Sequence, residues 1–227
     1  MSITKNMKAT NGWLIRRCAA IFGVLIFLAM SPSANAQTAK LPGSFHPAQI
    51  AGIETRMWRA YYRKDYPTLV NEGLMLLRTQ FGIPQEKAVD IAADLAKAAY
   101  TFSTSQGSYE QNVLPELSRA YEEIRLATGA KFSSESVAKA EIAWWKARRT
   151  PGQNSPENVG RLIGELYFEL YGLRNDDISR AALLRAEAAA ARDQSKLLGR
   201  EPDWKTIEGM LDESYTLLVR GLGTKSL

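Results

Sequence analysis

The sequence predicts an all-α fold, a single bundle of about eight helices preceded by a cleavable signal peptide. Apolar residues recur with the 3.6-residue period of a helix from residue 48 to the end of the chain. Prolines and glycines separate these apolar stripes at the places where helices begin and end. No stretch alternates apolar and polar residues with a period of two, so the pattern does not require strands.

The first 36 residues have the three parts of a secretory signal peptide. Four basic residues and no acidic ones precede or border an apolar run over residues 18–30, and Ala34-Asn35-Ala36 matches a small-x-small cleavage site. The run is shorter than the roughly 20 apolar residues that span a bilayer, which favours cleavage over retention as an anchor. We therefore expect cleavage after Ala36, export to the periplasm by the general secretory route, and no stable membrane insertion afterwards.

The composition excludes several classes of function. All 24 acidic residues but only 25 of the 29 basic ones follow Ala36, so that part of the chain has a net charge of +1 and lacks the basic excess of a nucleic-acid binder. Cys18 is the only cysteine and His46 the only histidine, which excludes a disulfide, a two-histidine metal site and a Ser-His-Asp triad within one chain. Because no glycine-rich phosphate loop is present either, we expect no cofactor and no metal.

The helices follow from the stripes and the residues between them. The most regular stripe lies in 85–105, with apolar residues at i, i+3, i+4, i+7 and onward. Ser155-Pro156-Glu157 combines a capping hydroxyl, a proline suited to the first turn and an acid at the positive end of the helix dipole. The expected helices are 48–64, 67–81, 85–105, 110–128, 134–149, 156–171, 176–197 and 203–221.

These helices are expected to form one domain. A polar lead-in, 37–47, precedes the helical domain, 48–227, and the most loop-like internal stretch, 150–154, allows at most a weak boundary. No pattern recurs near 34 or 40 residues, which argues against a solenoid of helical repeats. The helix expected at 176–197 is rich in alanine, which predicts close approach to a neighbouring helix and partly buried pairs among its charged residues.

One segment, from Glu141 to Arg149, has the residues of a recognition surface. On a helix, Trp144 shares one side with Glu141 and Arg148, while Trp145 and Arg149 share the neighbouring side. Such a surface would be an aromatic and cationic wall for a ligand that carries a carboxylate or a sugar. The alternative is that the tryptophans fill the core and the arginines neutralise the end of the helix.

The sequence therefore leaves two functions open. The first is a non-enzymatic binding or scaffolding module of the cell envelope, which recognises an envelope protein or a small anionic or sugar-like ligand through Trp144, Trp145, Arg148 and Arg149. The second is a cofactor-independent periplasmic enzyme. In that case Glu141, Glu165 or Glu169 would be an acid or base with a pKa raised by burial, and an arginine would hold the anion. An enzyme requires a pocket with a shifted carboxyl group, whereas a binding module requires an exposed site without one.

Overall fold

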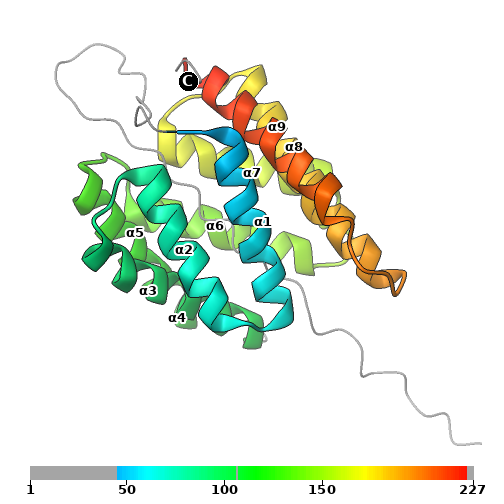
Figure 1. Cartoon of the computed structure of the whole chain (residues 1–227), viewed down its shortest axis with the longest axis horizontal. Coiled ribbons are helices and arrows are strands. Elements are labelled where there is room, and N and C mark those ends of the chain that lie inside the picture. The colour runs from blue at the N-terminus through cyan, green and yellow to red at the C-terminus, as the bar shows by residue number, and fades with distance from the viewer. Residues whose placement is uncertain (1–44, 106, 224–227) are drawn as a thin grey trace, which may run out of the picture.

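The computed structural model describes residues 45–105 and 107–223, and this part of the chain is a bundle of helices without strands (Figure 1), as predicted. The predicted signal peptide, 1–36, and most of the lead-in lie outside the described residues. None of the described helices is long and apolar enough to cross a membrane. The helices are α1 (Pro47–Arg63), α2 (Tyr66–Phe81), α3 (Gln85–Thr104), α4 (Tyr109–Asn112), α5 (Leu114–Thr128), α6 (Ser134–Arg149), α7 (Pro156–Tyr171), α8 (Asp176–Leu197) and α9 (Trp204–Gly221).

The single helix predicted over 110–128 is wrong, because the structure divides it into α4 and α5. Val113 is both the C-cap of α4 and the N-cap of α5, and its backbone N–H donates to the carbonyl of Tyr109 at 2.9 Å. Pro115 has no N–H to continue the ladder, so the helix restarts with proline in its first turn. The predicted cap of α7 is confirmed, since the Ser155 hydroxyl accepts the backbone N–H of Asn158 at 3.3 Å.

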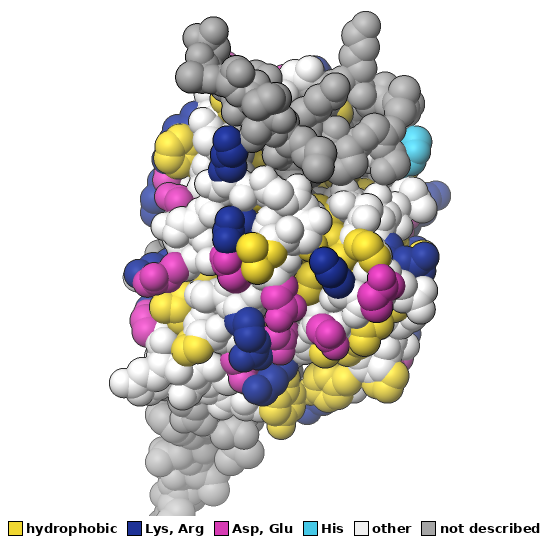
Figure 2. Space-filling model, turned by 90° about the vertical axis from the view of Figure 1, so that its left-hand side faces the viewer, with side chains coloured by type: hydrophobic (Ala, Val, Ile, Leu, Met, Phe, Trp, Pro, Cys, Tyr) yellow, Lys and Arg dark blue, Asp and Glu magenta, His cyan; other side chains and the backbone are white. Residues whose placement is uncertain are grey.

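The eight longer helices of the described part form a closed ring. Each packs on its neighbour along the chain, α3 continues the ring to α5, and α9 returns to pack on α1 (Figure 1). The apolar stripes point into this ring and share one core, which includes the whole stripe predicted on α3. On the part of the molecule visible in Figure 2, Lys and Arg side chains lie among Asp and Glu side chains.

The helix α8 approaches α7 closely, as its alanine content predicted. A Cβ added to Gly160 of α7 would lie 2.9 Å from the Cα of Leu183, so glycine is required at this crossing. Ala181 and Ala182 of α8 are fully buried. The predicted burial of charge on α8 is also confirmed, since Arg185 is 1% and Arg192 6% exposed.

Candidate functional site

Both tryptophans of the predicted recognition segment lie in the core. Trp144 and Trp145 are each 1% exposed, and their ring centroids are 6.2 Å apart in an edge-to-face arrangement. The two rings therefore fill the core, as the alternative interpretation of this segment expects, and do not form an exposed aromatic wall. The reason is that α6 packs against α5 on one side and α7 on the other, while its inner face looks into the ring, so both neighbouring sides of the helix are covered.

The two arginines of this segment are also engaged within the fold. The Arg148 side chain is 3% exposed, and its Nη2 lies 2.5 Å from Oδ2 of Asp193 on α8. Arg149 donates from Nη1 to the carbonyl of Phe102 on α3 at 2.6 Å, and its guanidinium lies 4.0 Å from the centroid of that ring. These contacts tie α6 to α8 and α3, so the two side chains do not form an exposed cationic wall.

The three candidate carboxyl groups do not converge. Glu141 is completely buried on the inner side of α6. Glu165, on the outer side of α7, forms a two-point ion pair with Arg174 at 2.7 and 2.8 Å, and this hydrogen bonding lowers the pKa of its carboxyl group. Glu169 is partly exposed one turn further along α7. Glu165 and Glu169 are neighbours whose charges both act on Arg174, and Glu141 lies apart from them on another helix.

A central polar network, which the sequence pattern did not predict, crosses the inside of the ring. It consists of Glu54 on α1, Tyr121 on α5, Glu141 on α6, Arg185 on α8 and Tyr215 on α9. Nη2 of Arg185 lies 2.5 Å from Oε1 of Glu54, and the Tyr215 hydroxyl donates to the other oxygen of the same carboxylate. One signal was available, because Glu54 stands inside the apolar stripe of the first helix.

Glu141 occupies the other end of the central polar network. The Tyr121 hydroxyl donates to its Oε2 at 3.3 Å. Burial raises the pKa of the Glu141 carboxyl group to about 8, although the charge of Arg185, the indole N–H groups of Trp144 and Trp145, and the Tyr121 hydroxyl oppose the shift. At neutral pH Glu141 is therefore mainly a neutral acid, enclosed by aromatic side chains and out of contact with solvent.

A second buried cluster lies where α1, α6 and α8 meet. Asp193 pairs with Arg148 and, at 3.1 Å, with Arg192. The Arg192 guanidinium lies 3.0 Å from the centroid of the Tyr62 ring, and burial raises the pKa of the Tyr62 hydroxyl. Two cations thus share one carboxylate against an aromatic face, an arrangement that holds helices together in low dielectric.

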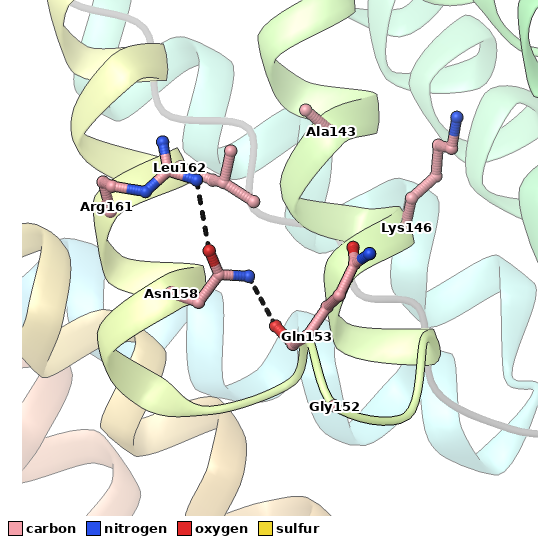
Figure 3. A pocket seen from close by; sticks show the side chains of 7 residues that line it. All are labelled: Ala143, Lys146, Gly152, Gln153, Asn158, Arg161 and Leu162. Atoms are coloured by element: carbon pink, nitrogen blue, oxygen red, sulfur yellow. Dashed lines mark hydrogen bonds between the residues drawn. The ribbon is translucent and has the colours of Figure 1, made fainter.

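A hollow of about 540 Å³ lies between α6 and α7, and we call it the α6–α7 groove. Figure 3 shows Asn158 and Arg161 of α7 and Gln153 of the connecting turn side by side, whereas the Lys146 side chain of α6 points away from Arg161. Nδ2 of Asn158 donates to the carbonyl of Gln153 at 2.7 Å, and its Oδ1 accepts from Nη2 of Arg161 at 3.1 Å. The remaining lining residues are Ala143, Gly152 and Leu162.

Hydrogen-bond donors outnumber acceptors among the side chains that line the α6–α7 groove. Both charged side chains that line it are cations, and no acidic residue does so. Lys146 lies 3.0 Å from Glu110, which stands outside the lining set, while Arg161 forms no ion pair with a carboxylate in the described ranges. A smaller hollow of about 340 Å³ between α7 and α8 contains the Glu165–Arg174 pair, whose charges cancel.

Among the described residues, no group of three His, Cys, Asp or Glu side chains is placed to hold a metal ion. Comparisons with known proteins found no matching family, no matching curated protein and no matching solved structure. The candidate site therefore rests on the geometry of this chain alone.

Proposed function

We propose that the chain is an exported, non-enzymatic binding module of the cell envelope, and that its ligand contacts the α6–α7 groove. The position of Glu141 carries the non-enzymatic part of the proposal. It is the candidate acid whose pKa is raised toward neutrality, yet it lines neither described hollow and is fully buried. A general acid or base must come within hydrogen-bonding distance of the proton that it transfers.

The chemistry of the α6–α7 groove defines the ligand. Arg161 presents guanidinium donors and Gln153 adds an amide, while the Lys146 ammonium pairs with Glu110 outside the lining residues. Such a set matches a ligand that carries several acceptor oxygens, a small anionic or sugar-like molecule. Ala143 and Leu162 supply an apolar wall for the carbon skeleton of such a molecule.

Export is supported by the leader pattern of residues 1–36. Intact-mass measurement on a periplasmic extract tests this part of the proposal. We expect a chain that begins at Gln37, whereas recovery of the uncut chain in the membrane fraction would contradict it.

Binding is tested by titrating the ¹⁵N-labelled protein with inorganic phosphate, acetate, glucuronate and uncharged glucose, each in turn. We expect saturable amide shifts at Gly152, Gln153 and Asn158 with the anionic probes, and weaker binding as salt rises. Arg161→Gln removes the unpaired cation and should weaken binding by about ten-fold, the effect of a lost charge-assisted contact.

The matched control is Arg180→Gln, which removes a guanidinium that pairs with Glu187 on the exposed side of α8. This variant should bind like the original chain. Unchanged affinity in Arg161→Gln, or shifts spread over helices remote from the groove, would contradict the proposal.

A further inference from the structure

The smaller hollow between α7 and α8, which we call the α7–α8 hollow, adjoins the α6–α7 groove. Its volume is about 340 Å³, and Arg161 of α7 lines both hollows. This side chain therefore stands on the ridge between them, and a molecule held by its guanidinium can extend into either. The hydrogen bond of Arg161 goes to a neutral side chain, that of Asn158 at 3.1 Å (Figure 3).

The surface of the α7–α8 hollow is mostly apolar. Gly160 and Gly164 leave α7 without side chains there, while Ile178 and Leu183 line the hollow from α8. Leu183 lies directly against Gly160, with its Cδ1 3.3 Å from the position that a Cβ would take. A hydrocarbon group that covers such a surface removes it from water, which is favourable in proportion to the apolar area buried.

The other charged side chains of the α7–α8 hollow are engaged within the protein. Arg174 and Glu165 form a two-point ion pair at 2.7 and 2.8 Å. Glu157 lies in the first turn of α7, where hydrogen bonds from its own backbone N–H and from the Ser155 hydroxyl lower the pKa of its carboxyl group. Arg161 therefore remains as the charged group that a ligand in this hollow can pair with.

We propose that the ligand is an amphipathic carboxylate, with its head on Arg161 and a short hydrocarbon tail in the α7–α8 hollow. This inference rests on the proposed function and names the class of molecule that the same site accepts. A guanidinium and a carboxylate match in shape and charge, and two parallel hydrogen bonds can join them. An inorganic anion or a sugar would leave the apolar surface beside its head exposed to water, so the combination favours a short-chain carboxylic acid.

A series of carboxylates of increasing length tests this proposal. The ¹⁵N-labelled protein is titrated with acetate, butanoate, hexanoate and octanoate. We expect affinity to rise by up to about four-fold for each CH₂ group that the hollow buries. Amide shifts should be confined to the groove, at Gln153 and Asn158, with acetate, and should extend to Gly160, Gly164 and Leu183 with hexanoate. Hexanol and hexylamine keep the tail but lack the carboxylate, and they should bind more weakly.

The variant Gly164→Leu tests the tail separately from the head. Its side chain would occupy part of the α7–α8 hollow, and a Cβ at this position meets only the Cβ of Ala182, at 4.0 Å. We expect the affinity for hexanoate to fall by at least about ten-fold, toward that for acetate. The matched control is Gly209→Leu on α9, where a Cβ meets nothing within 4 Å; it lines neither hollow and should bind hexanoate like the original chain.

Circular dichroism checks that each variant is folded, and the shifts at Gly160 and Leu183 in the original chain locate the tail without any variant. Equal affinity for acetate and hexanoate would overturn this inference and leave the proposed function standing. A rise with chain length that Gly164→Leu retains would also overturn it, as would hexylamine binding as tightly as hexanoate, which would make Glu157 the anchor. Absence of shifts with every carboxylate and with inorganic phosphate would contradict the proposed function as well.

Discussion

At the scale of single residues, the most consequential group is the buried carboxyl of Glu141. With Glu141 protonated, the carboxylate of Glu54 balances the guanidinium of Arg185, and the central polar network is neutral. Ionisation of Glu141 adds an uncompensated charge to a site without water contact, which is costly in low dielectric.

The free energy of unfolding should therefore fall as pH rises from about 5 to about 8. The pKa of Glu141 is raised in the folded state, from 4.5 to about 8, so the folded chain holds the proton that the unfolded chain releases, and stability is lost as pH passes through that window. Glu141→Gln cannot ionise and should remove a pH-dependent loss on the order of 4 kcal/mol. Denaturant titrations of both proteins across this range measure the effect; parallel pH profiles would contradict it.

Trp145 gives a second prediction at this scale. Its ring is buried against Phe102, with centroids 5.0 Å apart, so Trp145→Ala should lower the free energy of unfolding by about 3–5 kcal/mol. Trp204→Ala, in the first turn of α9 where the ring is partly exposed, is the control and should cost less. A loss below about 1 kcal/mol at Trp145 would mean that the ring is not a core element.

The burial of Trp144 and Trp145 also shows what the sequence leaves open about single residues. Spacing along a helix fixes which side chains share a side, and Trp144, Glu141 and Arg148 do share one. It does not say whether another helix covers that side. In this structure, α8 and the inside of the ring cover that side. The resulting contacts join residues more than 40 positions apart, such as Arg148 and Asp193.

At the scale of elements, local signals predict most of the helices. The periodicity of apolar residues, a proline in the first turn and a capping hydroxyl depend only on residues that are close together in the sequence. They can therefore be identified before the fold is known. The exception is the α4–α5 break. Pro115 marks the start of α5, but the four residues of α4 are too few to show a period of their own.

The crossing of α7 and α8 gives a prediction with a matched control on the same helix. Gly160→Ala places a methyl group 2.9 Å from the backbone of Leu183, and we expect a loss of about 1–3 kcal/mol, because the backbone there cannot move aside cheaply. Gly164→Ala meets only the Cβ of Ala182 at 4.0 Å, so alanine's higher helix propensity should leave stability unchanged or raised by up to about 1 kcal/mol. Thermal unfolding of both variants distinguishes the two effects; equal changes would contradict the close approach.

At the scale of the whole molecule, the ring depends on which helix meets which. The stripes identify the buried side of each helix but not its partner, so the return of α9 to α1 was not predictable from them. Nor was the central polar network, whose members come from five helices. What the sequence did indicate was that packing alone must stabilise the fold, because Cys18 lies in the predicted leader.

That indication gives the last prediction. A chelator or a thiol reductant should leave the melting temperature of residues 37–227 unchanged, since the described residues include no group of ligands for a metal and the only cysteine precedes the predicted cleavage site. Differential scanning calorimetry with and without each reagent measures this. A lower melting temperature with chelator would reveal an oxygen-ligated ion that stabilises the fold.

The seam between α1 and α9 has a consequence for how the chain matures. Tyr215 reaches Glu54 across 161 positions of sequence, and Phe45 contacts the same tyrosine with ring centroids 6.0 Å apart. The first helix therefore lacks its final partner until the last one has been synthesised. Closure of the ring is therefore a late, long-range step of folding, and a nascent chain that lacks α9 leaves the inner side of α1 without its partner.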